Sequence, residues 1–355
     1  MSWRETTLGE ITDLKRGFDL PKSQRLQGDV PVYSSSGITG SNSTAAVEGP
    51  CVITGRYGTI GEVFFSGGPC WPLNTALYST EFNGNNPRFI YYLLQTIPWQ
   101  GYTTASAVPG VNRNHVNLCP VKIPDRATQD AIVEVLDSIV DKIALNNQLN
   151  DYLSQICDAE FTDFVSNQRD ASWHDGTLNE LVEIRYGKDH KKLAEGPYPV
   201  YGSGGFMRSV EKPLSSGESV LIPRKGSLNN VMYVDEKFWT VDTMFFTIPL
   251  KPGAAKYVYQ YTKRLDFGTM NSGSAVPSMT TKILNSLVIP IPSDSALVSF
   301  NKKLQPFFDL FGKNEEENRR LVSLRDILLP KLMSGEIDVS KVDLTQLTNN
   351  HLADC

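Results

Sequence analysis

The sequence predicts an α+β protein in which two α/β domains, related by a pseudo-twofold axis, are separated by two long antiparallel coiled-coil helices. Two observations lead to this prediction. The chain of 355 residues contains a long internal repeat, and each copy begins with a part rich in Gly, Pro, Ser and aromatic residues that gives way to helical spacing of apolar residues. A chain of this length can also form two domains with separate cores.

The internal repeat has an offset of 170 residues at its start and 168 residues afterwards. The matching stretches are 3–10 with 173–180 (Trp-x-x-x-x-Leu-x-Glu), 31–33 with 199–201 (Pro-Val-Tyr), 56–59 with 224–227, 106–109 with 274–277 (Ser-Ala-Val-Pro) and 121–124 with 289–292. The period is too long for a solenoid unit, so each copy is a domain plus a connector. The predicted segments are domain 1 (1–124), spacer helix 1 (125–170), domain 2 (171–292), spacer helix 2 (293–340) and a C-terminal tail (341–355).

Within the domains, short β-branched and aromatic runs are separated by Gly, Asn and Pro, which predicts strands joined by turns. The clearest runs are 51–53, 63–65, 219–222 and 231–233. One helix is predicted in each copy, at 87–95 and at 255–263.

Both connectors carry an apolar stripe with spacings of mostly three and four residues, which is typical of an amphipathic helix. The stripe residues are Ile132, Leu136, Ile139, Ile143, Leu149, Leu153 and Ile156 in the first connector, and Phe300, Leu304, Phe307, Phe311, Leu321, Leu324 and Leu328 in the second. Each stripe has a polar centre, at 146–147 and at 314–316. The helices could each cover their own domain, but so narrow a stripe favours pairing of the two helices with each other.

A twofold relation between the repeats makes the paired helices antiparallel, because the first leads from domain 1 to domain 2 and the second returns. The domains are then expected at opposite ends of a spacer tens of ångströms long. One turn of B-DNA is about 34 to 36 Å, so the domains could face successive turns of one groove.

The formal net charge of −5 is unevenly distributed. The two repeated domains carry more Lys and Arg than Asp and Glu (9 against 8 in 1–124, and 14 against 11 in 173–292), whereas 125–172 has 3 basic and 10 acidic residues. Mildly positive domains permit contact with phosphate. No apolar run is long enough to span a bilayer and no signal sequence opens the chain, so a cytoplasmic protein without membrane contact is expected.

Motifs for catalysis and metal binding are not recognisable in the sequence. The five cysteines are odd in number and never spaced as Cys-x-x-Cys, and none of the four histidines has a partner at ligand spacing. We find no cofactor loop, methyltransferase motif, helicase motif or nuclease carboxylate cluster. Catalysis is therefore expected to come from other proteins, and neither a cofactor nor a metal is expected in this chain.

The strongest candidates for DNA contact lie in one turn of each copy, where glycines are flanked by cations and small hydroxyls: Arg56, Tyr57 and Thr59 in the first, and Arg224, Lys225 and Ser227 in the second. Such a turn can bring backbone amides and a guanidinium to a phosphate or a guanine edge, although it could equally be a β-hairpin turn whose glycines serve only the backbone.

Further candidates precede and follow the Pro-Val-Tyr strand of each copy, and others follow the Ser-Ala-Val-Pro stretch. They are Lys15, Arg16, Lys22, Ser35, Ser36, Arg113 and Asn114 in the first copy, and Arg185, Lys188, His190, Lys191, Lys192, Ser203 and Lys282 in the second. The basic clusters could be solvated loops, the serines could form simple turns, and Asn112 or Thr280 could cap a short helix.

These features together resemble the specificity subunits of type I restriction-modification systems, from Trp3 to about Val342. The resemblance is carried by the duplicated opening, the Arg-x-Gly-x-x-Gly loop at 56–61 with its variant at 224–229, the passages that end at Pro124 and Pro292, and the closing stretch 321–337. Asn229 stands where the family's loop commonly has a second glycine, which puts the geometry of that loop in doubt.

The resemblance implies two target-recognition domains that each recognise half of a split double-stranded DNA site, held apart by the helix pair. It also implies partners: two methyltransferase (modification) subunits that hold S-adenosylmethionine, and restriction/translocase subunits that use ATP and Mg²⁺. The chain would be a non-catalytic subunit of a phage-defence complex. A recognition subunit of another defence methyltransferase without a motor, or a stand-alone enzyme acting on DNA, is the alternative.

Overall fold

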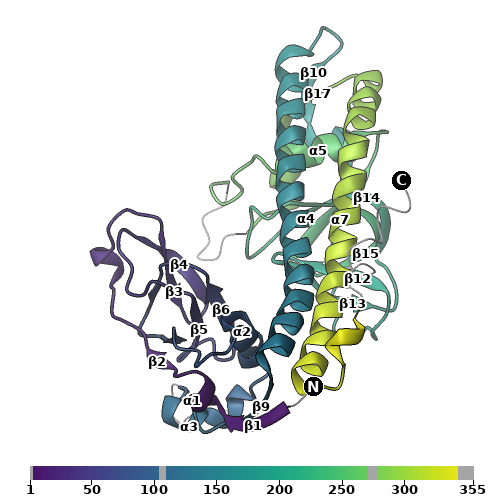
Figure 1. The fold of residues 1–355 in the computed structure, drawn as a ribbon. Coiled ribbons are helices and arrows are strands. Elements are labelled where there is room, and N and C mark those ends of the chain that lie inside the picture. The colour runs from purple at the N-terminus through teal and green to yellow at the C-terminus, as the bar shows by residue number, and fades with distance from the viewer. Residues whose placement is uncertain (1–2, 104–108, 271–277, 343–355) are drawn as a thin grey trace. The chain divides into compact units, whose positions relative to one another are not determined.

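The structure, a computed structural model, describes residues 3–103, 109–270 and 278–342. The chain divides into unit 1, Met1–Asn146 with Glu316–Cys355, and unit 2, Asn147–Glu315. Each unit contains one globular domain and parts of two long helices, α4 (Arg126–Asn167) and α7 (Asp294–Ser334) (Figure 1). The predicted α+β class is confirmed. Most of the predicted tail and of the two Ser-Ala-Val-Pro stretches lies outside the described residues.

Domain 1 contains a four-stranded sheet in the order β2-β8-β5-β6, a three-stranded sheet in the order β4-β3-β7 and a two-stranded ribbon of β1 and β9. Its strands are β1 (Trp3–Thr7), β2 (Lys15–Arg16), β3 (Val30–Ser34), β4 (Gly37–Asn42), β5 (Cys51–Gly55), β6 (Val63–Ser66), β7 (Trp71–Pro72), β8 (Ala76–Ser79) and β9 (Pro120–Pro124). Its helices are α1 (Leu8–Ile11), α2 (Pro87–Gln95) and α3 (Arg113–Val116).

Domain 2 contains a six-stranded sheet in the order β11-β16-β14-β15-β12-β13 and a ribbon of β10 and β17. Its strands are β10 (His174–Thr177), β11 (Val182–Tyr186), β12 (Tyr198–Gly202), β13 (Gly205–Val210), β14 (Ser215–Pro223), β15 (Met232–Thr240), β16 (Met244–Pro249) and β17 (Val288–Ile291). Its helices are α5 (Ala254–Thr262) and α6 (Thr281–Asn285).

The repeat in the sequence is a repeat in structure. The predicted strands form as the hairpins β5–β6 and β14–β15, each paired antiparallel. The helix predicted at 87–95 is α2, and the one predicted at 255–263 is α5, one residue earlier. Only β3 with β7 and β12 with β15 pair in parallel among the described strands, and these two pairs are equivalent in the repeat.

A short antiparallel ribbon closes each domain directly before its long helix, and it explains two of the repeated motifs. The opening strand β1 pairs with β9, so that Trp3 lies opposite Pro124, and β10 pairs with β17 in the same way. The end of the opening motif forms a capping box. The side chain of Thr7 accepts from the backbone amide of Glu10, and the Glu10 side chain accepts from the amide of Thr7; Thr177 and Glu180 do the same in the second copy.

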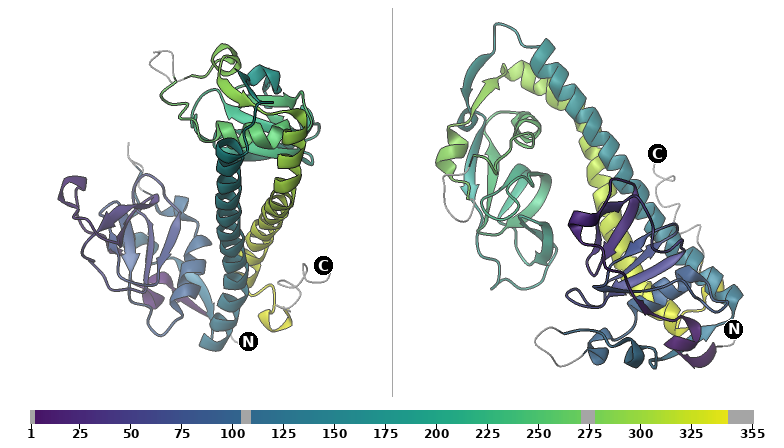
Figure 2. Two further views of the ribbon diagram at one scale, coloured as in Figure 1. Left: turned by 90° about the horizontal axis from the view of Figure 1, so that it is seen from above. Right: turned by 90° about the vertical axis from the view of Figure 1, so that its left-hand side faces the viewer.

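In each unit the segment of α4 lies beside the segment of α7 with opposite chain direction (Figure 2). In unit 1, Ile132 and Leu136 share a core with Leu329 and Leu332. In unit 2, the ring of Phe164 stacks on that of Phe300 with centroids 4.4 Å apart. The predicted antiparallel pairing is confirmed, and the same residues contribute to the cores of the domains. Pro306 and Gly312, which often interrupt helices, lie inside α7.

The prediction of the apolar stripe was wrong at three positions. Leu149, Ile156 and Phe311 are exposed, to 36%, 43% and 37%. In α4 the residues that follow Leu149 and Ile156, which are Asn150 and Cys157, are buried instead. The stripe was misassigned because a polar seam residue cannot be recognised from apolar spacing alone.

The polar centres of the two stripes are buried and hydrogen-bonded. In unit 1, Asn146 Nδ2 donates to Asn318 Oδ1 at 3.0 Å and to Glu317 at 2.7 Å. In unit 2, Asn314 Nδ2 donates to Asn150 Oδ1 at 2.7 Å. The repeat offset of 168 relates Asn146 to Asn314 and Asn150 to Asn318, so the two pairs are equivalent to each other in the repeat. A buried amide without a partner is costly, so these pairs favour one register of the helices.

No helix in the described ranges has an apolar stretch long enough to cross a membrane.

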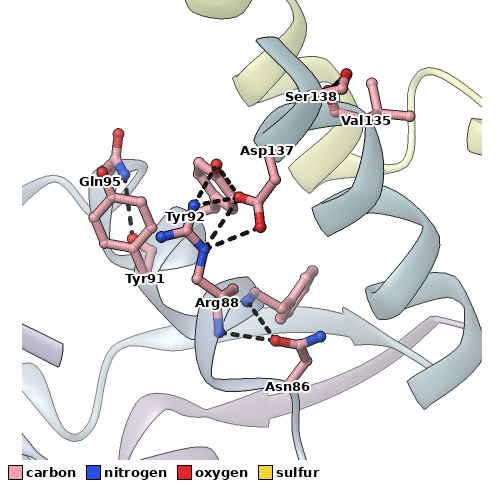
Figure 3. A network of polar contacts seen from close by, with 9 residues as sticks. Asn86, Arg88, Tyr91, Tyr92, Gln95, Val135, Asp137 and Ser138 are labelled. Atoms are coloured by element: carbon pink, nitrogen blue, oxygen red, sulfur yellow. Dashed lines mark hydrogen bonds and ion pairs between the residues drawn. The ribbon is translucent and has the colours of Figure 1, made fainter. Parts of the chain in front are cut away.

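An arginine of α2 fastens domain 1 to α4 (Figure 3). The Arg88 guanidinium forms an ion pair with Asp137 of α4, with Nε 3.1 Å from both carboxylate oxygens. The Tyr92 hydroxyl donates to the same carboxylate at 2.5 Å. Burial is the main cause that raises the pKa of Tyr92, and it keeps the phenol protonated as a donor. The side chain of Asn86 caps α2 by accepting hydrogen bonds from the backbone amides of Arg88 and Phe89.

A lysine occupies the equivalent position in unit 2. Lys256 of α5 is completely buried and forms an ion pair with Glu218 of β14. Its ammonium also donates to Asn301 at 3.0 Å and to Gln305 at 2.9 Å, both on α7. A buried ammonium must be paired and hydrogen-bonded, so this contact holds α5, β14 and α7 together.

Lys256→Ala is expected to lower the free energy of unfolding by about 3 to 5 kcal/mol, because it leaves Glu218 without its buried partner. Urea unfolding monitored by circular dichroism measures this. The matched control is Lys251→Ala, which removes a surface ion pair to Asp294 of α7. It should lower the free energy of unfolding by about 1 kcal/mol or less. Equal losses for the two variants would contradict an anchoring role for Lys256.

Candidate nucleic-acid interface

The loop at 56–61 connects β5 to β6, as predicted, and its backbone requires glycine. Gly58 and Gly61 have φ angles of +77° and +94°. A Cβ atom at Gly55 would lie 1.7 Å from the carbonyl oxygen of Thr59. The glycines therefore allow the backbone conformation that this tight turn requires, and Thr59 is exposed at its surface.

The loop is tied to the segment that precedes α3. The amide of Val111 donates to the carbonyl oxygen of Arg56 at 2.9 Å, and Tyr57 forms a bridge with Gly110. The Tyr57 ring lies so close to Gly110 that a Cβ there would be 2.3 Å from a ring carbon. The Arg56 guanidinium lies over the Tyr57 ring, 4.5 Å from its centroid. This stack limits the freedom of Arg56 before any ligand binds.

Three arginines from separate segments line one open cavity of about 390 Å³. Arg16 comes from β2, Arg56 from the loop and Arg113 from the first turn of α3, and Tyr57 lines the same cavity. In the described part of the chain none of the three guanidinium groups forms an ion pair with a carboxylate. The structure thus brings together four of the predicted contact residues. Arg16 and Arg56 are 40 positions apart in the sequence, and Arg56 and Arg113 are 57 positions apart.

Two other predicted cations have carboxylate partners. Lys15, the neighbour of Arg16, forms an ion pair with Glu81 at 2.5 Å, and this hydrogen bond raises the pKa of the lysine. Arg185 donates from two nitrogens to Glu183 at 2.9 Å each, which lowers the pKa of that glutamate. These two side chains are partly neutralised and do not line the cavity. Lys22 is exposed in a 3-10 turn at Lys22–Gln24.

Domain 2 builds the equivalent loop with other side chains. The Arg224 guanidinium lies 5.5 Å from the centroid of the Tyr186 ring, and the Tyr186 hydroxyl lies 3.4 Å from Thr281 Oγ1. Lys225 bridges to Ser278 as Tyr57 does to Gly110. The exposed Ser227 follows Gly226, which has a φ of +84°.

The second loop differs from the first at its end. Asn229 replaces Gly61 but does not adopt a positive φ. Its side chain donates to Asp266 at 3.0 Å and accepts from the amide of Gly268 at 3.3 Å. The backbone at this position therefore differs from that of the first loop, and Asn229 attaches the loop to the segment after α5.

The predicted serines lie against these loops. A Cβ at Gly58 would be 3.4 Å from Ser35 Oγ, and one at Gly226 would be 2.5 Å from Ser203 Oγ. The Asn230 amide also donates to the carbonyl oxygen of Ser203 at 2.8 Å. The β3–β4 and β12–β13 turns are therefore part of the candidate interface. Ser36 is exposed in the first of them.

The remaining candidates lie at the edges of the interface. Asn112 and Thr280 cap the short helices α3 and α6, as the alternative interpretation proposed, and the exposed Asn114 and Lys282 follow them. Lys188, His190, Lys191 and Lys192 lie between β11 and β12, where His190 is half-buried and the lysines are exposed.

Sequence analysis missed Tyr186 and the apolar side chains of the second strand in the β3–β4 and β12–β13 hairpins. Tyr186 is 49% exposed and occupies the place of Arg16, as the pairing of β2 and β11 with equivalent strands shows. Aligning residues 15–17 with 185–187 would have identified it. Ile38, Phe206 and Met207 are each more than half exposed, and apolar side chains on a hairpin carry no sequence signal of their own.

Among the described residues, no three His, Cys, Asp or Glu side chains gather as a metal site. The cysteines at 51, 70, 119 and 157 are buried as free thiols, and burial raises the pKa of Cys157 to about 11. The candidate interface therefore offers cations, hydroxyls and amides.

Comparison with known proteins identifies the family. The family described as the type I restriction modification DNA specificity domain matches residues 1–155 and again residues 171–322. The chain is similar to the type I restriction enzyme HindI specificity subunit of Haemophilus influenzae, with 21% identity over 94% of this chain and 99% of the relative. A putative type I specificity subunit of Mycoplasma pneumoniae is 23% identical over 93% of this chain and 96% of its own.

A solved structure supports the fold. The crystal structure of the type I restriction-modification system S subunit from M. genitalium has a TM-score of 0.59 with 18% identity, covering 94% of this chain and 96% of that one. Two matches to one family, in the two halves that the internal repeat defines, account for most of the sequence. The chain therefore belongs to the type I restriction-modification DNA specificity family.

Proposed function

We propose that this DNA specificity protein recognises a bipartite, asymmetric double-stranded target, with one half-site bound by each globular domain. The observation that supports this is the repetition of one framework with unlike contact residues. The loops 56–61 and 224–229 have the same anchoring hydrogen bonds to the segment before a short helix. Their surroundings differ, with Arg16 and Arg113 in one domain and Tyr186 and Thr281 in the other. Different side chains on the same backbone select different bases.

We further propose that the helices bind two modification subunits, which hold S-adenosylmethionine and methylate adenine N6, and that restriction subunits using ATP and Mg²⁺ join the complex. The chain itself carries no cofactor and acts in the cytoplasm. Purified chain with S-adenosylmethionine and DNA should then give no methylation until modification subunits are added. Methylation by the chain alone would favour the alternative of a stand-alone enzyme, and neighbouring genes without a motor subunit would favour a defence methyltransferase.

The methylated adenines are expected in a target with two unlike parts separated by a gap of unspecified bases, because the two sets of contact residues differ. Genome-wide mapping of methylated adenine measures this. A continuous palindrome would contradict the assignment of one half-site to each domain.

Arg224→Ala is expected to weaken binding of the target by about 1 to 3 kcal/mol and to relax the preference at one position of the second half-site, because a guanidinium beside uncharged hydroxyls suits the two acceptors of a guanine edge. Binding to single-base variants of that half-site, at fixed salt, measures both effects. An equal loss for every sequence would instead indicate that Arg224 holds a phosphate.

The length of the helix pair is expected to set the gap between half-sites. Inserting seven residues after Asn147 and seven after Glu315 adds two helical turns and about 10 Å. The insertions fall between the two buried asparagine pairs, so the contact of Asn146 with Asn318 and that of Asn150 with Asn314 should each survive. At about 3.4 Å per base pair, the gap should grow by two to three base pairs while the half-sites stay unchanged.

Methylation mapping of this insertion variant gives the gap directly. The control carries the insertion in one helix only, which shifts the helices out of register and should abolish methylation. Full activity of the double insertion with an unchanged gap would show that the helices do not determine the spacing.

A further inference from the structure

We propose that the three-arginine cavity of domain 1 binds a phosphate of the DNA backbone, whereas the equivalent place in domain 2 does not. Domain 1 would then be positioned on its half-site by this cavity, and its base contacts would come from neighbouring side chains. The inference rests on the proposed DNA recognition and deepens it, because it distinguishes residues that position the DNA from residues that select a sequence.

The number of guanidinium groups favours a phosphate over a base. Arg16, Arg56 and Arg113 line one cavity of about 390 Å³ without a carboxylate partner in the described residues. A guanine edge in the major groove offers two acceptors, which one guanidinium satisfies. Three positive charges that line one cavity raise the local positive potential and favour an anion there. A phosphodiester supplies a negative charge and two free oxygens, and guanidinium groups bind these through paired hydrogen bonds.

The cavity is also preorganised for a fixed anion. The Arg56 guanidinium lies on the Tyr57 ring, that ring lies on the backbone of Gly110, and the carbonyl of Arg56 is held by Val111. Arg113 starts a helix whose cap, Asn112, accepts a hydrogen bond from the amide of Asn114 at 3.0 Å. The backbone of the site and the Arg56 side chain therefore lose little freedom when a ligand binds.

Domain 2 provides the internal comparison. Tyr186 stands in the place of Arg16 and Thr281 in the place of Arg113, and their hydroxyl oxygens are 3.4 Å apart. Arg224 is thus the one guanidinium that this group of side chains contains. Lys225 stands in the place of Tyr57, so the equivalent place in domain 2 has one guanidinium and one ammonium, where domain 1 has three guanidinium groups.

The test exchanges the residues between the copies. The variant Arg16→Tyr with Arg113→Thr gives domain 1 the side chains that domain 2 tolerates at these places. Binding of the full chain, together with the modification subunits of the proposed complex, is measured by fluorescence anisotropy on a duplex that contains the methylated target, between about 50 and 200 mM salt. Removing one bound phosphate lowers the slope of log affinity against log salt by about 0.9, which makes the salt-induced decrease in affinity roughly 3.5-fold smaller.

For a phosphate site, the variant should show this smaller slope and should lose affinity by the same factor for the target and for single-base variants of the first half-site. Arg16→Lys should retain most of the slope. The control Lys122→Ala removes a surface cation paired with Glu5 at 3.0 Å and should leave the slope unchanged. If the double variant does not fold, Arg113→Thr alone, at an exposed position, is measured in its place.

An unchanged slope together with the loss of preference for one base would overturn the proposal and make the arginines base readers. An unchanged slope and unchanged affinity would remove the cavity from the interface. Failure of the proposed function has a different signature: the unmodified protein would then bind its target and an unrelated duplex equally well.

Discussion

The arrangement of each unit depends on one cation that joins a short helix of the globular domain to a long helix. Arg88 reaches Asp137, and at the equivalent place Lys256 reaches Gln305 and Asn301. The position is the same in both copies, but the contact differs: Arg88 forms a partly exposed ion pair, whereas the ammonium of Lys256 is fully buried. Because such groups tolerate little displacement once desolvated, they fix how each domain sits on its helix, and this decides which loops face away from it.

The buried asparagines place a second constraint, on the helices themselves. An apolar seam alone would allow the helices to slide by a heptad or to pair in parallel, since one leucine packs much like another. Asn146 with Asn318, and Asn150 with Asn314, are satisfied only in the antiparallel register observed within their own units. Hydrogen bonds are thus used here less for stability than for specifying one alignment, and any distance that the helices impose depends on that alignment.

Much of the fold could be predicted because the sequence states it twice. Two occurrences of a weak strand pattern at a constant offset are stronger than either alone, and this is why the hairpins and α2 were located correctly. The buried face of the long helices was not predicted correctly, because Leu149 and Ile156 continue the apolar spacing and yet are exposed in the structure. In the site, adjacent residues differ: Lys15 pairs with Glu81 while Arg16 lines the cavity, because neighbouring side chains of a strand point to opposite faces. Only the tertiary structure shows which face of the strand lies beside a carboxylate and which lines the cavity.

The two copies also show how one scaffold can carry different side chains at the candidate interface. The features that fix the loops are backbone features: glycines with positive φ, a hydrogen bond from a backbone amide to the carbonyl oxygen of Arg56 or Arg224, and a capped short helix. None of these involves the tips of the side chains that line the cavity. The exchange of Arg16 for Tyr186 therefore changes charge and hydrogen-bonding capacity without altering the course of the chain around it. The candidate contact residues can therefore diverge between domains while the anchoring cation and the asparagine pairs keep each domain in place, since these residues are not the ones that hold the fold.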